Sequence, residues 1–253
     1  MHKKDWFVNF TTDSLNRNLV VFFPHAGGSA SLYFPLAQAL SKISNVAVVE
    51  LPGRGMRFDE PSYLNFDELV YNLTNALKNI HLENTIFFGH SMGALIAFEC
   101  AKLLEEEHKL RLKSLIVSGQ DAPHNRRASP GFLKSHLTNE ELTQALLSIG
   151  GIPTEMLKYP DLLDLTLQII RDDCKLLESY SYLLNSSVSC PLVCFAAKND
   201  PVITLSDCHM WSFITNQFCS YIQIEGGHFA IFQNDQLFQK ITYDILHNIE
   251  GAK

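Results

Sequence analysis

Short apolar runs alternate along the chain with stretches in which apolar residues recur at helical spacing. The runs indicate buried strands, because each is brief and nearly continuous in apolar side chains. They cover residues 19–23, 45–51, 85–88, 115–118, 192–196 and 221–224. The helical patterns cover residues 31–40, 66–77, 92 to about 104 and 237–249. Strands that alternate with helices predict an α/β fold, with a mostly parallel central sheet and helices on both faces.

The alternation stops between residues 119 and 188, where no run is typical of a strand. The segment Thr138–Glu141 has the pattern of a capping box, which predicts the start of a helix that the pair Gly150–Gly151 then ends. We therefore predict a core made of residues 1–118 and 189–253, interrupted by a helical insertion over residues 119–188.

A second helix of the insertion is expected to begin at Pro160, because the N–H that proline lacks has no partner in a first helical turn. This helix carries two apolar stripes, whereas a helix that only covers a core needs one. The first stripe is Leu163, Leu167, Ile170, Cys174 and Leu177, and the second is Leu162, Leu165, Ile169 and Leu176. Two stripes fit either a thicker core or a lid whose inner face lines an apolar channel.

Composition agrees with a folded domain. The chain has 253 residues, of which 46% are apolar and 19% are charged, and this balance argues against disorder. The length fits one large domain or one domain with an insertion. The net charge is -7 without any basic block, so we expect neither nucleic acid nor a membrane surface as a partner. No long apolar run follows the first residues, so we expect no signal peptide, no membrane span and a cytoplasmic location.

The chain has six cysteines, and no two of them form a C-x-x-C pair. Several lie inside apolar runs, as Cys194 does between Val193 and Phe195. We expect free thiols that pack as small apolar side chains, with a structural disulfide as the alternative. No cluster of histidines and cysteines has the spacing of a zinc site, so we expect no metal and no other cofactor.

The most informative pattern is G-x-S-x-G at residues 89–93, centred on Ser91. It directly follows the predicted strand at 85–88 and directly precedes a helical stretch. In that context the pattern predicts a nucleophile elbow, a sharp turn that exposes a serine hydroxyl at the end of a sheet. The alternative is a glycine-rich turn in which Ser91 only caps the helix.

A serine needs a base within hydrogen-bond reach before it can act as a nucleophile. His228 is our candidate base, because it follows the strand at 221–224 after two glycines that let the chain turn. The imidazole in turn needs a carboxylate that fixes its tautomer, placed after a strand between the serine and the histidine. Asp200 fits this position and is favoured, while Asp121, which follows the strand at 115–118, is the rival.

An oxyanion hole requires two backbone N–H groups close to the serine. Met92, the residue after Ser91, is expected to supply one of them. Ala26 is expected to supply the other, since the loop 24–29 follows an early strand and its glycines let the main chain approach a ligand. The same loop also fits a plain glycine-rich turn or a phosphate nest, but not a P-loop, because no Gly-Lys-Ser/Thr follows.

A further loop, Leu51-Pro52-Gly53-Arg54-Gly55, follows the strand at 45–51. It is expected at the carboxyl edge of the sheet, where ligands bind in open α/β folds. Arg54 either holds this loop in shape, which we favour, or meets a substrate phosphate.

Together these segments resemble the type II thioesterases that accompany nonribosomal peptide and polyketide synthases. The resemblance covers nearly the whole chain and rests on residues 23–30, 51–55, 89–94, 226–229, 147–153 and 171–180. The last two segments, in the insertion, are the specific part, since the elbow is common to all α/β-hydrolases. The resemblance implies an α/β-hydrolase fold with a helical lid and a Ser-His-Asp triad.

The resemblance also implies roles for single residues. Carried over by position, the catalytic residues are Ser91, Asp200 and His228, and the oxyanion donors are the N–H groups of Ala26 and Met92. The candidate substrate-binding residues in the same motifs are His25, Gly27, His90 and Phe229. Cys174 departs from the family pattern, in which an aromatic residue is common, and we expect it to alter the lining of an acyl channel and not the chemistry.

The implied reaction is hydrolysis of the thioester between an acyl group and the phosphopantetheine arm of an acyl or peptidyl carrier protein. Such enzymes clear stalled or wrongly primed carriers during antibiotic biosynthesis. We expect a monomer, because the chain shows no heptad run and no evident exposed apolar strand. Arg126 and Arg127 either meet acidic residues of the carrier or lie in a solvated loop, which we favour.

Three other functions remain open. A chain-terminating medium-chain thioesterase of fatty-acid synthesis shares the fold and the triad, so motifs do not separate it. A carboxylesterase or lipase is disfavoured by the loop at 51–55 and by the pattern of the insertion. A non-enzymatic, hydrolase-like binding module usually lacks a member of the triad, whereas all three candidates are present here.

Overall fold

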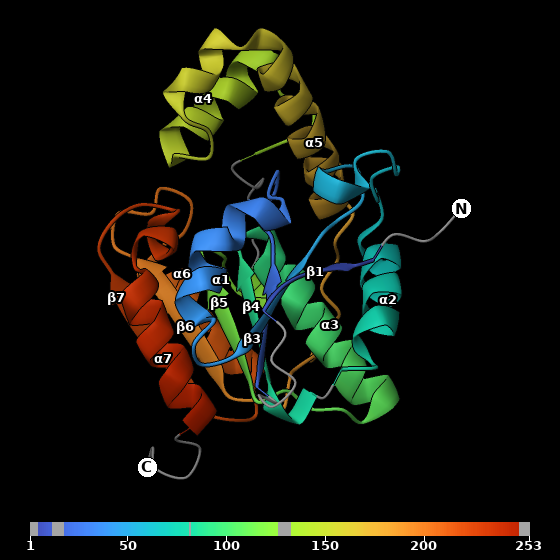
Figure 1. Ribbon diagram of the computed structural model, residues 1–253, viewed down its shortest axis with the longest axis vertical. Helices are drawn as coiled ribbons and strands as arrows, with labels where there is room; N and C mark the ends of the chain where they lie inside the picture. The colour runs from blue at the N-terminus through green and yellow to red at the C-terminus, as the bar shows by residue number, and fades with distance from the viewer. Residues whose placement is uncertain (1–4, 12–17, 81, 126–132, 248–253) are drawn as a thin grey trace.

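The structure is a computed structural model that describes residues 5–11, 18–80, 82–125 and 133–247, and of Thr11 and Glu83 it describes only the backbone. Its centre is a seven-stranded sheet in the order β1-β3-β2-β4-β5-β6-β7 (Figure 1). The strands are β1 (Phe7–Thr11), β2 (Leu19–Phe23), β3 (Asn45–Val49), β4 (Thr85–His90), β5 (Ser114–Ser118), β6 (Leu192–Ala197) and β7 (Cys219–Ile224). All neighbouring strands pair in parallel except β1, which is antiparallel to β3. The predicted mostly parallel sheet is confirmed.

The sequence pattern missed one strand, β1. The side chains of residues 7–10 are half-buried or exposed and Asn9 interrupts the apolar run, as is common in an edge strand that only one neighbour covers. The central strands β2 to β5 are almost wholly buried, and their continuous apolar runs therefore predicted strands correctly.

Helices cover both faces of the sheet, as predicted. On one face α1 (Phe34–Leu40) and α7 (Asp235–His247) pack against the sheet in one apolar cluster. On the other face a larger cluster contains α2 (Phe66–Leu77), α3 (Met92–His108) and α6 (Leu205–His209). Short 3₁₀ turns complete the core, at Ala30–Tyr33, Gly55–Arg57, Leu82–Asn84, Pro123–Asn125, Met210–Ile214 and Ala230–Gln233.

Some boundaries differ from the predicted ones. The pattern at 31–40 is a 3₁₀ turn followed by α1, since Pro35 falls in the first turn of the α-helix. Helix α3 continues to His108, beyond the predicted end near Leu104. The acidic residues 105–107 follow the predicted end, and the carboxylate of Glu105 accepts the N–H of Ser189, so this stretch belongs to the packed structure.

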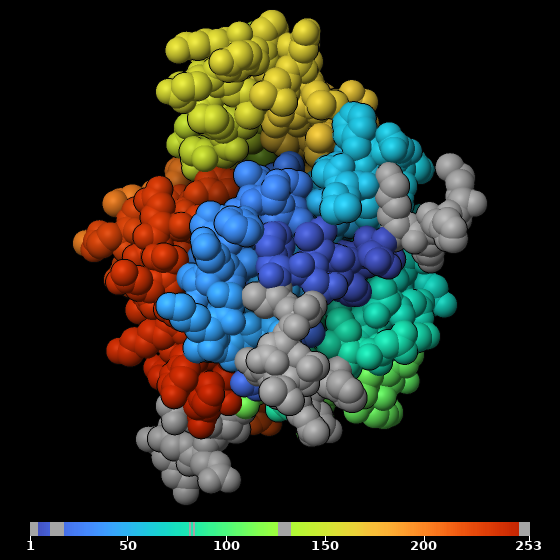
Figure 2. All heavy atoms as spheres, in the orientation of Figure 1, coloured from blue at the N-terminus to red at the C-terminus, as the bar shows by residue number. Residues whose placement is uncertain are grey.

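The predicted helical insertion contains α4 (Asn139–Ile149) and α5 (Pro160–Glu178), joined through a 3₁₀ turn at Thr154–Lys158. The predicted capping box at Thr138 and the proline in the first turn of α5 are both present. These helices form a small apolar cluster of their own, made of Leu142, Leu146, Ile152, Leu167, Ile170 and Cys174. They stand beyond one end of the sheet, in yellow in Figures 1 and 2.

The two stripes of α5 have different surroundings. The first stripe supplies Leu167, Ile170 and Cys174 to the apolar cluster of the insertion. The second stripe is divided, since Leu176 is buried in the core beside α3, whereas Leu162 and Leu165 are 49% and 38% exposed. A thicker core therefore explains the second apolar stripe only at the end of α5 that lies next to the sheet.

Within the described part of the chain, no helix combines the length and the apolar character needed to cross a membrane. The same residues contain no group of three or more His, Cys, Asp and Glu side chains arranged to hold a metal ion.

Candidate active site

Ser91 lies at the sharp junction between β4 and α3. Its backbone angles are φ 52° and ψ −122°, and its N–H donates to the carbonyl of Ser118 at 2.8 Å. The two flanking glycines are required by close backbone contacts. A Cβ at Gly93 would lie 2.0 Å from the carbonyl oxygen of Phe23, and one at Gly89 would lie 2.3 Å from the oxygen of Gly93. The strained, positive-φ serine between two such glycines is the geometry of a nucleophile elbow.

Asp200 and His228 come together from the loops that follow β6 and β7. The Asp200 Oδ2 atom lies 2.9 Å from His228 Nδ1, and the two side chains are 0% and 3% exposed. Oδ1 of the same carboxylate accepts the N–H of Val202 at 2.8 Å. The two loops are also joined by a bond from the N–H of Asn199 to the carbonyl of Gly226, at 2.9 Å. The carboxylate is thus held on both oxygens and aimed at the ring.

The His228 ring lies close to the elbow. A Cβ at Gly119 would be 3.1 Å from Cε1 of His228, and Gly119 directly follows Ser118, the residue that accepts the Ser91 N–H. The Ser91 hydroxyl and the Nε2 atom of His228 make no hydrogen bond with other described residues. Both atoms are therefore available to a substrate.

Two backbone N–H groups near Ser91 have no acceptor among the described residues. One is the N–H of Met92, the first residue of α3. An anion bound there would also be stabilised by the positive end of the helix dipole. The other is the N–H of Ala26, in the turn that follows β2. A carbonyl of Phe23, at the end of β2, lies against Gly93, so this turn and the elbow are neighbours.

The candidate substrate-binding residues divide into two groups. His90 is fully buried and His25 is 8% exposed, so both rings pack behind the elbow, whereas Gly27 and Phe229 are half-buried. The ring of Phe229 makes edge contacts with His25 and His228, with centroids 5.0 and 5.1 Å apart. Burial lowers the pKa of His25 to about 3 and lowers that of His90 well below its ordinary value. Both rings are therefore neutral near pH 7.

The Arg54 side chain is buried inside the protein. Its guanidinium donates two hydrogen bonds of 2.6 Å to the carboxylate of Asp173 on α5, and both side chains are buried. The favoured interpretation of Arg54, as a residue that holds its loop in shape, agrees with this pairing. Sequence reasoning missed Asp173, which also accepts the N–H of Gly27 at 2.7 Å. Its only signal was its place in the segment 171–180 that resembles the thioesterases.

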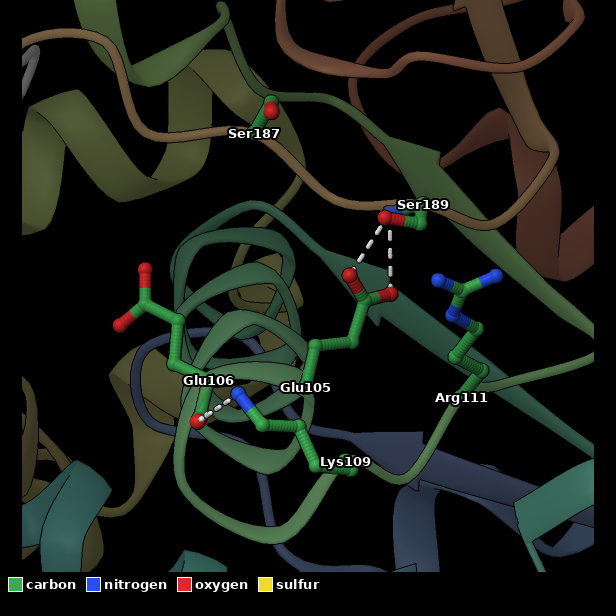
Figure 3. Close-up of a pocket in the computed structure, with 6 residues that line it drawn as sticks. All are labelled: Glu105, Glu106, Lys109, Arg111, Ser187 and Ser189. Atoms are coloured by element: carbon green, nitrogen blue, oxygen red, sulfur yellow. Dashed lines mark hydrogen bonds between the residues drawn. The ribbon is translucent and has the colours of Figure 1, made fainter.

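A surface hollow of about 360 Å³ lies elsewhere, beside the last turns of α3 and the starts of β5 and β6 (Figure 3). It is lined by Glu105, Glu106, Lys109, Arg111, Ser187 and Ser189. Ligands of α/β sheets bind at the carboxyl ends of the strands, where Ser91 and His228 lie, and this hollow is at the amino ends. It therefore does not belong to the candidate site.

The elbow, the late histidine and the mostly parallel sheet define an α/β-hydrolase. Residues 18–248 match the family profile described as "Thioesterase domain", and the chain belongs to that family of acyl-thioester hydrolases.

Individual relatives agree with this assignment. Thioesterase PikA5 of Streptomyces venezuelae is 33% identical over 227 residues, which cover 89% of this chain and 79% of PikA5. The medium-chain S-acyl fatty acid synthase thioesterase of Anas platyrhynchos is 28% identical and covers 85% of both chains. Among solved structures, the type II thioesterase BorB from the borrelidin biosynthetic cluster has a TM-score of 0.87 at 30% identity, covering 97% of this chain and 99% of BorB.

Proposed function

We propose that this chain is a serine thioesterase that removes acyl groups from the phosphopantetheine arm of carrier proteins, in a synthase for nonribosomal peptides or polyketides. One observation carries the proposal. A chain of the thioesterase family has a strained elbow serine, a buried Asp200–His228 pair, and two N–H groups near that serine without an acceptor among the residues that the structure describes. The relatives PikA5 and BorB support the class of pathway, since BorB is described as a type II thioesterase of a biosynthetic cluster.

In the first half of the proposed reaction, His228 Nε2 takes the hydroxyl proton of Ser91 while Oγ attacks the thioester carbonyl carbon. The carbonyl oxygen becomes an oxyanion and accepts the N–H groups of Met92 and Ala26. Asp200 keeps the proton of His228 on Nδ1 and stabilises the imidazolium. The C–S bond then breaks, the sulfur leaves with the proton from Nε2, and the acyl group remains on Ser91.

In the second half, a water molecule gives a proton to His228 Nε2 and attacks the acyl carbon. The same N–H groups hold the second oxyanion until the ester bond to Ser91 Oγ breaks. His228 returns the proton to Oγ, and the free carboxylic acid leaves. Because a thiolate is a good leaving group, modest contacts to the acyl chain suffice.

The direct test is a Ser91→Ala variant measured on acyl-loaded carrier protein. We expect the hydrolysis rate to fall by about 10⁴-fold or more, because the nucleophile and its base act as one unit. Ser148→Ala, on the exposed surface of α4, is the matched control and should hydrolyse at the wild-type rate. Unchanged hydrolysis by the Ser91→Ala variant would reject the proposed triad and favour a binding module.

A second candidate function is chain termination in fatty-acid synthesis, which the similarity to the Anas platyrhynchos enzyme favours. Hydrolysis rates measured on acetyl-loaded and on decanoyl-loaded carrier protein distinguish the two functions. An editing enzyme hydrolyses both at comparable kcat/KM, whereas a strong preference for decanoyl carrier would support the medium-chain function.

We also propose that the inserted helices α4 and α5 act as a lid over the acyl group, and that the chain works on the carrier as a monomer. The exposed Leu162 and Leu165 on α5 support a lid with an apolar side that is free in the described structure. Arg126 and Arg127, the other candidates for contact with the carrier, lie outside the described residues. Light scattering of the chain with and without carrier tests the stoichiometry.

A further inference from the structure

We propose that His90, the residue directly before Ser91, is a positioning residue for the base of the triad. The imidazole of His228 packs against the buried ring of His90, and this contact directs the Nε2 atom of His228 toward Ser91. The inference rests on the proposed function, since it takes His228 as the base. It assigns His90 a contact with the catalytic base in place of the contact with substrate that its motif implied.

His90 is connected to both the nucleophile and the base. It is the last residue of β4 and is covalently joined to Ser91. The centroid of its ring lies 4.9 Å from that of His228, with 50° between the ring planes, so the two rings are in contact. A Cβ at Gly119 would lie 2.5 Å from Cε1 of His90 and 3.1 Å from Cε1 of His228, so both rings reach the same point of the chain.

The hydrogen bond to Asp200 does not by itself fix the direction of Nε2. It joins Oδ2 of Asp200 to Nδ1 of His228 at 2.9 Å, and a ring held at one atom can still tilt about that atom. Because Nε2 is separated from Nδ1 by Cε1, any such tilt moves Nε2 relative to Ser91. Contacts to the rest of the ring must therefore restrict the tilt.

Two aromatic rings could supply that restriction. The centroids of Phe229 and His90 lie 5.1 and 4.9 Å from that of His228. Phe229 follows His228 in the same loop, so it shares any movement of that loop. His90 belongs to the sheet and is bonded to Ser91, so it is the contact that relates the His228 ring to the nucleophile.

His90 is itself held rigidly. It is fully buried, and it pairs with Ser118 of β5 in the middle of the sheet. Its ring is surrounded by the rings of Phe229, Phe232 and His25, with centroids 5.2, 5.3 and 5.8 Å away. Such a ring can transmit the position of the strand to the imidazole of His228.

The ring of His90 is also uncharged. Burial lowers its pKa well below the ordinary value, and the nearby His228 lowers it further. His90 therefore stays neutral when His228 takes the proton of Ser91, and it adds no repulsion to the imidazolium that forms.

The test compares H90Q with H90A. H90Q keeps an uncharged planar group of similar size, whereas H90A removes the group that His228 packs against. Hydrolysis of a hexanoyl-N-acetylcysteamine thioester gives kcat and KM. Proton NMR follows the low-field signal of the His228 Nδ1–H, which Asp200 accepts. If H90A does not fold, H90V takes its place, because valine suits a strand.

We expect H90A to have a kcat about 10- to 100-fold below that of H90Q, because a misplacement of about 1 Å can cost about 10²-fold. KM should be similar, since the ring of His90 is fully buried. The His228 signal should shift or broaden in H90A and stay near its wild-type position in H90Q. A merely structural role would lower the melting temperature and leave both kcat and the His228 signal of the folded protein unchanged.

Ile86→Ala is the matched control, because it also removes a buried side chain from β4. It lies four residues before His90, about 13 Å away at the rise of a strand. It should lower the melting temperature and retain the wild-type kcat.

Equal kcat in folded H90A and H90Q, or a loss that appears only in KM, would overturn the inference. The Ser91→Ala variant is measured alongside. If it is inactive while the two His90 variants are equal, only the role of His90 fails, and if it is active, the proposed function fails.

Discussion

The carboxylate of Asp200 faces the imidazole of His228 across two loops, with Oδ2 2.9 Å from Nδ1. The other oxygen of Asp200 is held by the N–H of Val202, so the carboxylate does not need to rotate to serve the ring. A carboxylate in this position keeps a proton on Nδ1 and leaves Nε2 as the basic atom. Of the two carboxylates that the sequence offered, Asp200 has this geometry, while the side chain of Asp121 accepts a bond from Gln120.

The first prediction concerns this pair. Asp200→Asn keeps the shape of the side chain but presents an N–H to the imidazole, which stabilises the wrong tautomer. We expect kcat to fall by about 10⁴-fold with a folded protein, as for the same change in a serine protease triad. Asp121→Asn is the control and should keep most of the activity. A larger loss in Asp121→Asn than in Asp200→Asn, measured on acyl-loaded carrier, would reverse the assignment.

Sequence reasoning could propose the parts of the candidate site that depend on local context. The elbow at Ser91 is encoded by a strand, two glycines and a helix that are continuous in the chain. Asp200 and His228 could be proposed because each follows a strand, and parallel strands bring their carboxyl ends to one edge.

The contacts that the inserted helices make with distant loops could not be predicted from local sequence context. Asp173 and Gly27 are separated by 146 positions, and no periodicity links a residue inside a helix to a distant turn. The apolar stripes of α5 did not decide between a thicker core and the lining of a channel, and in the structure Leu162 and Leu165 of the second stripe are exposed. A stripe shows that a helix has an apolar face, but what covers that face is decided by the rest of the fold.

A second prediction tests the close contact behind the elbow. Gly93→Ala places a methyl group 2.0 Å from the Phe23 carbonyl oxygen, which is backbone and cannot move aside. We expect a loss of at least about 3 kcal/mol in the free energy of unfolding, at the upper end of overpacking changes. Gly151→Ala is the control, because its nearest contact is the flexible end of Leu146 at 3.2 Å. Urea denaturation of both variants should give a much larger loss for Gly93→Ala, and equal losses would contradict the close contact.

A third prediction concerns the thiols. All six cysteines are free, and only Cys219 is not fully buried. Burial raises the pKa of Cys100 and Cys190 to about 12, so at neutral pH these thiols are protonated and unreactive. We expect a colorimetric thiol reagent to modify Cys219 first in the native protein and all six cysteines after denaturation. Rapid modification of Cys100 in the native protein, detected by mass spectrometry, would contradict its burial.

The last prediction follows from the two buried histidines behind the elbow. Burial is the main cause that lowers the pKa of His25 from 6.5 to about 3, and it also lowers the pKa of His90. Below pH 6.5 the unfolded chain binds protons at these positions, whereas the folded chain does not. The stability is therefore fully present above this pH and is lost as the pH falls toward the folded pKa of about 3.

From about pH 7 to about pH 5, each histidine that stays neutral in the fold should cost about 2 kcal/mol of stability, at about 1.4 kcal/mol per pH unit below its ordinary pKa. His25→Asn removes one of these groups, so its free energy of unfolding should fall less steeply over that range than the wild-type value. Its lower stability at neutral pH does not affect the comparison, because only the slope is used. Ser148→Ala, which removes no titrating group, should leave the slope unchanged. If the free energy of unfolding changes with pH at the same slope in wild type and in His25→Asn, the prediction is wrong and His25 accepts a proton inside the fold. The burial of His25 against Tyr33 and His90 makes that protonation unfavourable.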